Sequence, residues 1–199
     1  MSNNLFPIFL KLDQINTLIV GGGNVGLEKL EALIKNDPNA RITIVAPLIS
    51  DEIRAIAADK KSIVLKNRRY RQGDLRNADI AILATDDREL HQRIKGRAKL
   101  FKVIVNVADT PALCDFYLGS TVKRGDLKLG ISTNGQSPTF AKRYRQALEA
   151  SLPEETNDLL GNLRIIRDHL SGNFSDKVRQ LNHITKSLVE SHGSSPNLN

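Results

Sequence analysis

A glycine-rich segment near the start of the chain has the residues and the spacing to bind a phosphate group. Residues 21–26 read Gly-Gly-Gly-Asn-Val-Gly and fit the pattern G-x-G-x-x-G, between an apolar run and a helical pattern. In this pattern the glycines allow a tight turn, let the backbone approach a pyrophosphate and let the helix pack closely. We therefore expect a bound dinucleotide rather than a glycine turn without a ligand. The expected contacts are Gly21, Gly22, Gly23, Asn24, Val25 and Gly26.

Two further groups of polar residues follow apolar runs. Residues 84–87 read Ala-Thr-Asp-Asp, and residues 106–109 read Asn-Val-Ala-Asp. In an open parallel sheet, ligands lie outside the carboxyl ends of the strands. We therefore expect both groups to face the same crevice as the glycine loop. The expected cofactor contacts in these groups are Ala84, Thr85, Asp86 and Asn106.

Asp109 is the candidate catalytic residue. It would stand where the reactive ring of a dinucleotide meets a substrate, and a carboxylate at that point can act as a general acid or base. The same carboxylate could instead cap the loop that begins with Thr110 and Pro111. The residues alone leave both interpretations open.

The apolar runs that must position these residues alternate with helical patterns. Expected helices begin near residues 27, 51 and 88, and expected strands cover residues 5–10, 17–20, 42–45, 62–65, 80–84 and 103–107. Continuous apolar strands that alternate with helices are typical of a parallel sheet covered on both faces. The expected fold class is therefore α/β, with a Rossmann-like doubly wound parallel sheet that ends near Asp109.

The pattern changes after residue 110. Residues 116–122 and 127–132 flank a polar turn, which predicts an antiparallel hairpin. Ser137 followed by Pro138 is typical of a helix start, and Pro153 separates that helix from two C-terminal helices with apolar stripes, the second ending at Leu188. Such stripes are typical of a core or a subunit interface. We expect three domains, which are residues 1–110 for the dinucleotide, 111–152 for the hairpin and helix, and 153–199 for C-terminal helices with a frayed tail from Ser191.

Composition and charge argue against several classes of protein. The net charge of +7 indicates an anionic partner. The densest basic run, residues 66–71, contains one aromatic residue and is expected to be a solvated loop, so nucleic acid is not an expected partner. No apolar run reaches the roughly 18 residues of a membrane span. The first residues lack the basic region of a signal peptide, so we expect a cytoplasmic protein.

Other site chemistries find little support. The one cysteine, Cys114, excludes an internal disulfide and a multi-cysteine metal site, and the four histidines form no metal-ligand pair at helical spacing. Each histidine is therefore expected to be a surface or packing residue, and no metal site is expected. No tyrosine is followed four residues later by a lysine, which argues against a short-chain dehydrogenase.

Several segments occur in the order found in one family. The stretches FPIFLKLDQINTLIVGGGNVGLEK, ATDD, VNVAD, CDF and GISTNGQSPTFAKRYRQALEASLP together resemble the precorrin-2 dehydrogenases of sirohaem synthesis. The resemblance covers about residues 5–153. Some members of that family are short proteins, and others form the N-terminal part of multifunctional sirohaem synthases. This sequence departs from the family pattern at Gly26, where many members have Ala, and at His91, where Asn is common.

The resemblance implies an activity and a cofactor site. Precorrin-2 would be oxidised to sirohydrochlorin with NAD+ taking up the hydride, and the family's aspartate falls on Asp109. Nucleotide contacts fall on Asn24 and Val25 in the loop and on Pro47 and Leu48 after the second buried strand. An acid that binds the adenosine ribose is usual near that strand end, and backbone groups would replace it here. This strand end has no acid that would repel a 2′-phosphate and no arginine immediately beside it that would bind one. NAD is therefore favoured, and NADP is not excluded.

The resemblance also implies a basic substrate cleft and a homodimer formed through the middle segment, residues 111–152. Precorrin-2 carries carboxylate groups, which basic side chains and the free N–H groups of a helix N-terminus would bind. The expected substrate contacts are Ser132, Thr133, Asn134, Ser137, Arg124, Lys142 and Arg143.

Alternatives stay open at this level. Some family members also insert Fe²⁺ into sirohydrochlorin, and no residue of this sequence distinguishes them from members that act only as dehydrogenases. An NAD-sensing regulatory module would use the same glycine loop without chemistry, and it would bind NAD without affinity for a tetrapyrrole. A nucleic-acid-binding protein is a third interpretation, which salt-dependent DNA binding would reveal.

Overall fold

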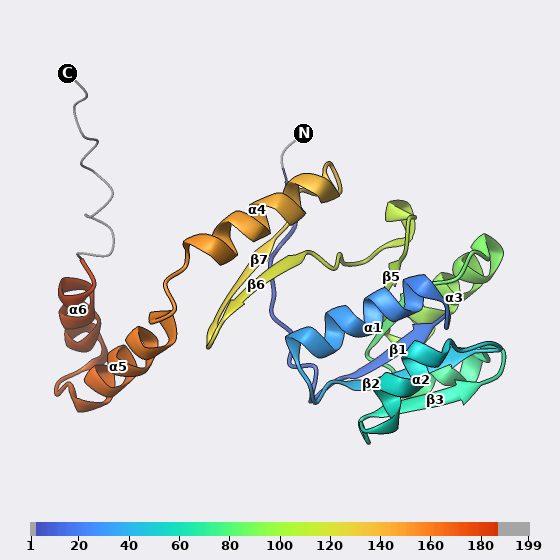
Figure 1. The fold of residues 1–199 in the computed structure, drawn as a ribbon, viewed down its shortest axis with the longest axis horizontal. Coiled ribbons are helices and arrows are strands. Elements are labelled where there is room, and N and C mark those ends of the chain that lie inside the picture. Colours follow the sequence, from blue (N-terminus) through green and yellow to red (C-terminus); the bar gives the residue numbers. More distant parts are fainter. Residues whose placement is uncertain (1–2, 187–199) are drawn as a thin grey trace. The chain divides into compact units, whose positions relative to one another are not determined.

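The first part of the chain is built on a five-stranded parallel sheet (Figure 1). The computed structural model describes residues 3–186, which divide into two compact units between Leu118 and Gly119. The strands are β1 (Asn16–Val20), β2 (Arg41–Ala46), β3 (Ile63–Asn67), β4 (Ile80–Leu83) and β5 (Ile104–Val107). They lie in the order β3-β2-β1-β4-β5, and all neighbouring pairs are parallel. This confirms the expected doubly wound α/β fold.

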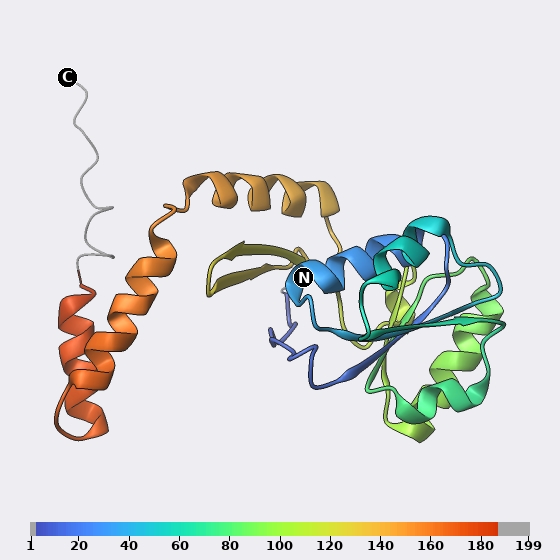
Figure 2. The same cartoon turned by 60° about the horizontal axis from the view of Figure 1, so that its bottom comes forward.

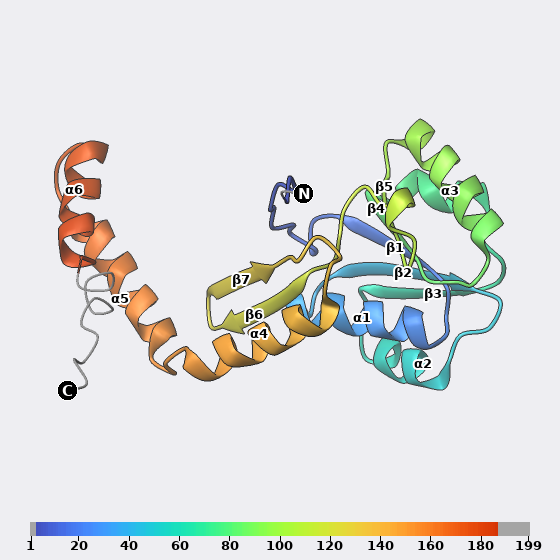
Figure 3. The same ribbon diagram turned by 90° about the horizontal axis from the view of Figure 1, so that it is seen from above.

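Helices cover both faces of this sheet, α1 (Asn24–Asn36) and α2 (Asp51–Ala58) on one face and α3 (Arg88–Phe101) on the other (Figures 2 and 3). Successive side chains of β1 alternate between the faces because strand side chains have a period of two. Ile19 packs with the cluster under α1 and α2, whereas Leu18 and Val20 pack with the cluster under α3. Both faces are buried, which explains why the strands read as continuous apolar runs.

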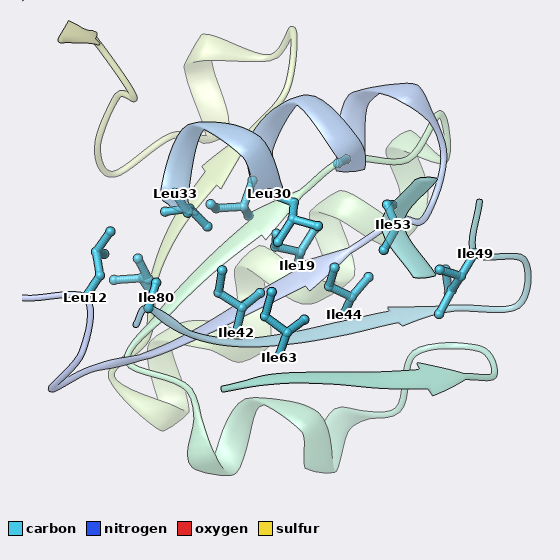
Figure 4. Packing of buried hydrophobic residues seen from close by; sticks show 14 residues of the cluster. Leu12, Ile19, Leu30, Leu33, Ile42, Ile44, Ile49, Ile53, Ile63 and Ile80 are labelled. Carbon is cyan, nitrogen blue, oxygen red and sulfur yellow. The ribbon is translucent and has the colours of Figure 1, made fainter. Parts of the chain in front are cut away.

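The larger cluster lies between the sheet and the first two helices (Figure 4). Leu30 and Leu33 of α1 and Ile53 of α2 pack over Ile19 and Ile44 of the sheet, and each of the five is at most 4% exposed. Because α1 begins directly after β1, this packing fixes the position of the helix N-terminus relative to the carboxyl ends of the strands.

The expected strand at residues 5–10 is wrong. This segment has no regular secondary structure, and Phe6, Ile8 and Phe9 are 86%, 59% and 66% exposed. A strand needs a neighbour with free backbone groups, and both edges of β1, the strand that follows, are already taken by β2 and β4. Pro7 also lacks the N–H that a strand ladder needs. Apolar composition alone therefore did not predict strand pairing.

The sequence predicts a solvated loop at residues 66–71, but in the structure part of this basic run binds a buried carboxylate. Asp74, in the 3₁₀-helix η1 (Gln72–Asn77), is buried and accepts hydrogen bonds from the Arg68 guanidinium at 2.8 and 2.6 Å and from Lys66 Nζ at 3.3 Å. The backbone N–H of Arg71 also donates to Asp74 at 2.9 Å. Burial by itself raises the pKa of Asp74, but these donors outweigh it and lower the pKa to about 2.

The second unit contains a hairpin and three helices, which are β6 (Ser120–Arg124), β7 (Leu127–Ile131), α4 (Pro138–Ser151), α5 (Thr156–His169) and α6 (Phe174–Ile184). The antiparallel hairpin is confirmed, with a two-residue turn in which Gly125 has a φ of 58°. Ser137 caps α4 by accepting a hydrogen bond from the Phe140 N–H at 3.1 Å, as the sequence predicts. Leu188 and the expected tail lie outside the described residues.

Within the second unit, α5 holds the hairpin turn. The Asn157 side-chain oxygen accepts a hydrogen bond from the Asp126 N–H at 3.0 Å. Between residues 3 and 186, no helix has the length and apolar character needed to cross a membrane.

Replacing Asp74 by Asn should lower stability and change its dependence on pH. The pKa of Asp74 in the folded protein lies below its ordinary value of 3.8, so its contribution is present above about pH 4 and is lost as the pH falls toward 2. At pH 7 we expect the free energy of unfolding to fall by about 2 to 4 kcal/mol. Urea unfolding at a series of pH values measures this. Asp59→Asn, at an exposed residue, is the control, and an Asp74→Asn curve parallel to that of the wild type would refute the assignment.

Candidate functional site

The carboxyl ends of β1, β4 and β5 bring three loops to one edge of the sheet. Backbone hydrogen bonds continue the ladders beyond the strands, from Gly21 N to Val45 O at 3.0 Å, from Ala84 N to Val20 O at 2.8 Å and from Ala108 N to Leu83 O at 3.0 Å. The glycine loop and the segments after β4 and β5 are therefore neighbours. This is the edge at which an open parallel sheet binds ligands.

Gly21 and Gly22 hold the loop against two other backbone segments. Gly21 has a φ of 127°, and a Cβ added to it would lie 2.1 Å from the Ala84 carbonyl oxygen. A Cβ on Gly22 would lie 2.4 Å from the carbonyl oxygen of Leu48, and the Ser50 N–H donates to Gly22 O at 2.9 Å. No side chain fits at either position, so these glycines fix the loop against the segments that follow β4 and β2.

The N-terminus of α1 is open where the loop ends. Gly23 is its N-cap residue and supplies no side-chain cap, and the first turn contains no acidic residue. A Cβ on Gly23 would meet no atom within 4 Å, unlike a Cβ on Gly21. The free N–H groups and the positive end of the helix dipole therefore face unfilled space beside Asn24 and Val25, which is the arrangement that binds a phosphate.

The segment after β2, which includes Pro47 and the 84% exposed Leu48, is held from two sides. The Asn67 side-chain N–H donates to the Pro47 carbonyl at 2.7 Å. Arg54, on α2, donates from Nε to the carbonyl of Ile49 at 3.2 Å and from Nη2 to the Asn67 side-chain oxygen. The sequence analysis did not identify Arg54 or Asn67 as site residues. The one available signal was the position of Asn67 at the end of a strand. Arg54 and Asn67 fix the backbone at the point where an acid is usual.

The segment after β4 brings together two residues that the sequence treated separately. The half-buried Thr85, an expected cofactor contact, has its Oγ1 2.9 Å from Nε2 of His91. His91 is 2% exposed, so it is a buried residue with a polar contact to the site. Asp86 is exposed, and Asp87 caps α3 by accepting from the Leu90 N–H at 2.8 Å.

Asp109 lies in a turn directly after β5. Its carboxylate is exposed, and its φ of 55° lies in the left-handed region, which Asp and Asn adopt more readily than most residues. Asn106, an expected cofactor contact, is 7% exposed and donates from Nδ2 to the Phe116 carbonyl at 2.8 Å. In this structure the Asn106 amide therefore ties β5 to the returning chain, and its contact with a cofactor stays a prediction.

The residues of the CDF motif hold the turn that carries Asp109. The Cys114 sulfur accepts from the Val107 N–H at 3.2 Å and donates to the Val107 carbonyl at 3.3 Å. Asp115 accepts from the Val105 N–H at 2.9 Å and forms an ion pair with Lys95 of α3. Burial raises the pKa of Asp115, but the Lys95 and Val105 contacts outweigh this and lower it. Cys114 and Asp115 are thus supporting residues that the site prediction did not include.

In the second unit, the expected polar contacts before α4 do come together. Thr133 Oγ1 accepts from the Ser137 N–H and donates to the Ser137 carbonyl, each at 3.3 Å. Ser132 Oγ accepts from the Asn134 N–H at 3.2 Å, and Asn134 has a φ of 53°. These bonds shape a tight loop at the N-terminus of α4, close in sequence to the exposed Lys142 and Arg143 on the first turns of the helix.

Arg124 is not part of that group. Its Nη2 donates to the Glu149 carbonyl at 2.7 Å, near the C-terminal end of α4. With a rise of about 1.5 Å per residue, Glu149 lies about 16 Å along the helix from Pro138. The Arg124 guanidinium therefore compensates the negative end of the α4 dipole, and the structure does not bring it to the loop of Ser132 and Ser137.

The arrangement in the first unit is that of a Rossmann-type dinucleotide-binding protein. Residues 8–120 match the family model described as putative NAD(P)-binding, and the chain belongs to that family. Residues 124–151 match a second model, described as sirohaem biosynthesis protein central. The family and the open N-terminus of α1 together support NAD as the cofactor.

Relatives and a solved structure extend this finding. The chain is 40% identical over 152 residues to the siroheme synthase of Psychrobacter cryohalolentis, and 34% identical over 186 residues to that of Pseudoalteromonas atlantica. These matches cover 76% and 91% of this chain but 28% and 37% of the relatives, so the chain spans about a third of their length. A solved structure titled "SirC, precorrin-2 dehydrogenase" matches with a TM-score of 0.69 and 26% identity over 94% of both chains.

Substitution of Gly23 by Ala should weaken NAD binding without unfolding the protein. The φ of −93° at Gly23 suits alanine, but the added methyl group would occupy the unfilled space at the helix N-terminus. We expect the Kd of NAD, measured by calorimetry, to rise at least about tenfold while the loss of stability stays near 1 kcal/mol, as for other caps replaced by alanine.

Two further variants serve as references for Gly23→Ala. Gly73→Ala is the matched control, because a Cβ on Gly73 also meets nothing within 4 Å and the residue lies in η1. Gly21→Ala should fail to fold, since its Cβ would clash with the Ala84 carbonyl. An unchanged Kd for Gly23→Ala would show that the phosphates do not bind at this helix N-terminus.

Proposed function

We propose that this protein is an NAD-dependent precorrin-2 dehydrogenase that oxidises precorrin-2 to sirohydrochlorin in sirohaem synthesis. The observation that carries the proposal is the meeting, at one sheet edge, of an open helix N-terminus and a turn with an exposed carboxylate, Asp109. The named relatives support the choice of substrate, since one is a precorrin-2 dehydrogenase and the others are siroheme synthases. The family support for NAD fits a reaction that removes a hydride.

The proposed reaction removes two hydrogens from the tetrapyrrole, one as a hydride and one as a proton. NAD+, when bound, supplies the chemistry of hydride acceptance. Asp109 is proposed to accept the proton and then to release it to water, which its exposed position allows. The supporting bonds from Cys114 and Asp115 hold the turn and so limit the conformations in which the carboxylate can meet the substrate.

The second unit is proposed to bind the carboxylates of the substrate. The supporting observation is the tight loop from Ser132 to Ser137 at the N-terminus of α4, followed by the exposed Lys142 and Arg143. We assign Arg124 a structural role, because its guanidinium already binds the C-terminal end of α4. In domain terms, residues 1–110 would hold the cofactor, 111–152 the substrate and the subunit contact, and 153–199 the C-terminal helices.

The variant Asp109→Asn tests the catalytic role. Asn keeps the size of the side chain and also tolerates the left-handed backbone, so the fold should be retained. With freshly generated precorrin-2 and NAD+, we expect kcat, followed by NADH absorbance, to fall at least about 100-fold, while the Kd of NAD stays within about twofold. Asp59→Asn is the control for removal of one exposed carboxylate.

The outcomes separate the alternatives. A variant with most of its rate would show that Asp109 is not the proton acceptor. A wild-type protein that binds NAD but oxidises no precorrin-2 would instead indicate the NAD-sensing module.

A homodimer formed through the second unit is part of the proposal. Between residues 119 and 186, Val122 and Ala141 are the only hydrophobic side chains that are buried. Phe140 and Tyr144, stacked with ring centroids 5.8 Å apart, are 59% and 48% exposed on one face of α4. A two-stranded hairpin with so small a core is marginally stable in isolation, and a second copy covering this face would complete it.

Sedimentation velocity checks the dimer. We expect the wild-type protein to sediment as a dimer and Phe140→Glu as a monomer with unchanged helix content, because a carboxylate cannot be buried against the partner without cost. Phe174→Glu, at an 81% exposed phenylalanine of α6, is the matched control and should remain dimeric. A monomeric wild type would exclude the proposed interface.

The proposed location is the cytoplasm. A reaction that consumes NAD requires a compartment that supplies it, and the Cys114 thiol, which bonds to the turn of Asp109 in reduced form, suits a reducing compartment.

A further inference from the structure

We propose that the Thr85 hydroxyl donates a hydrogen bond to an acceptor oxygen of the bound dinucleotide, and that the buried His91 side chain fixes it as a donor. Thr85 would touch the cofactor, whereas His91 would act through Thr85 as a positioning residue. The inference rests on the proposed NAD site and adds to it a residue outside the crevice.

Thr85 lies next to the glycine loop. The Ala84 carbonyl, which precedes Thr85 directly, is the group against which Gly21 packs without a Cβ. The Ala84 N–H is bound to Val20 at the end of β1, so the Thr85 backbone is fixed beside the loop. Its side chain is half-buried, and it is therefore within reach of a ligand that occupies the crevice.

The hydrogen bonds of His91 determine which ring nitrogen carries the proton. Nε2 lies 2.9 Å from Thr85 Oγ1, whereas Nδ1 is buried and has no hydrogen-bond partner in the described part of the chain. A neutral imidazole carries one N–H, and a buried N–H without an acceptor is rarer in proteins than an unfilled acceptor. The proton therefore belongs on Nε2, which donates to Thr85.

The assignment of a single N–H to His91 applies to the neutral imidazole. Burial lowers the pKa of His91 below its ordinary value of 6.5, while the charges of Asp87 and Asp86 oppose this shift in part. At pH 7 the ring is therefore neutral, and the choice between its two nitrogens decides the state of Thr85.

A hydroxyl group has one hydrogen and two acceptor positions. The His91 Nε2–H occupies one acceptor position of Thr85 Oγ1, and the Asp87 N–H approaches the other at 3.4 Å. The hydrogen of Thr85 must then donate elsewhere, and within residues 3–186 it has no acceptor. Thr85 is half-buried and directly follows Ala84, which packs against the glycine loop, so an oxygen of the dinucleotide is the acceptor that would complete the arrangement.

Calorimetric titration with NAD tests the donor. Thr85→Val removes the hydroxyl with little change in shape, and we expect the Kd of NAD to rise about tenfold, whereas Thr85→Ser should stay within about threefold. Thr17→Val is the matched control. Thr17 is a buried threonine near the end of β1 that lies away from the glycine loop, and its hydroxyl has no partner within the described residues. It should leave the Kd unchanged.

Two variants of His91 test its positioning role. His91→Phe keeps a buried ring without an N–H and should raise the Kd of NAD about three- to tenfold. His91→Gln can place an amide N–H near the position of Nε2 and should restore the affinity to within about threefold. A purely structural role would not produce this rescue. If His91→Phe fails to fold, the threonine variants and the spectrum described next still decide the question.

Long-range ¹H–¹⁵N NMR spectra of the histidine-labelled wild-type protein report which nitrogen of His91 carries the proton. A proton on Nε2 is expected, and a proton on Nδ1 would overturn the inference. An unchanged Kd for Thr85→Val in a protein that binds NAD would overturn it while leaving the proposed function intact. A loss of NAD affinity in Thr85→Val but not in His91→Phe would overturn the positioning role of His91. A wild-type protein that binds no NAD would overturn both proposals.

Discussion

The contact between the Gly21 backbone and the Ala84 carbonyl determines the geometry of the whole crevice. Because no Cβ separates them, the loop after β1 lies directly against the end of β4. The same loop turns into α1, whose apolar face is anchored on the sheet by Leu30 and Leu33. One close backbone contact therefore fixes both the direction of α1 and the position of its open N-terminus, where a phosphate would meet backbone N–H groups and no acidic residue of the first turn.

Several polar side chains near the glycine loop and the ends of the strands bind backbone groups of the neighbouring segments. Asn67 holds the segment after β2, Asp115 binds β5, and the Cys114 sulfur binds the turn after β5. Each of these contacts satisfies a backbone N–H or C=O at a strand end or on the outer edge of β5, where the sheet provides no partner. The loops that surround the crevice are thus held in place by residues that need not touch a ligand.

The sequence predicted the sheet well because its information there is local. Continuous apolar runs marked the buried strands, and the cap at Ser137 marked the start of α4. The glycine spacing likewise indicated the tight turn between β1 and α1, whereas its binding of a phosphate stays a prediction. The position of Asp109 after an apolar run made it a candidate but left a capping role open, and the family resemblance favoured the catalytic role and added the region after β2.

What the sequence did not predict depends on partners far along the chain. Residues 5–10 have the composition of a strand but no free edge to join, and the pairing of Arg68 with Asp74 requires η1 to fold back on β3. The guanidinium of Arg124, an expected substrate contact, donates to the Glu149 carbonyl near the C-terminal end of α4, and the sequence does not predict that contact. The burial of His91 against Thr85 follows from the packing of α3. Hydrophobic periodicity does not predict which ring nitrogen of a histidine meets which side chain.

The strand order has a consequence for how the protein is made. β1, which leaves the ribosome before the other strands of this sheet, is the central strand, and it pairs with β2 on one side and with β4 on the other. The half made of β3, β2 and β1 can assemble once residue 67 has emerged, but the wall that Ala84 and Thr85 contribute is still missing. Domains generally begin to fold from the N-terminus during synthesis. The nascent chain therefore has a glycine loop before it has a crevice, and NAD can stabilise the domain only after β4 has joined the sheet.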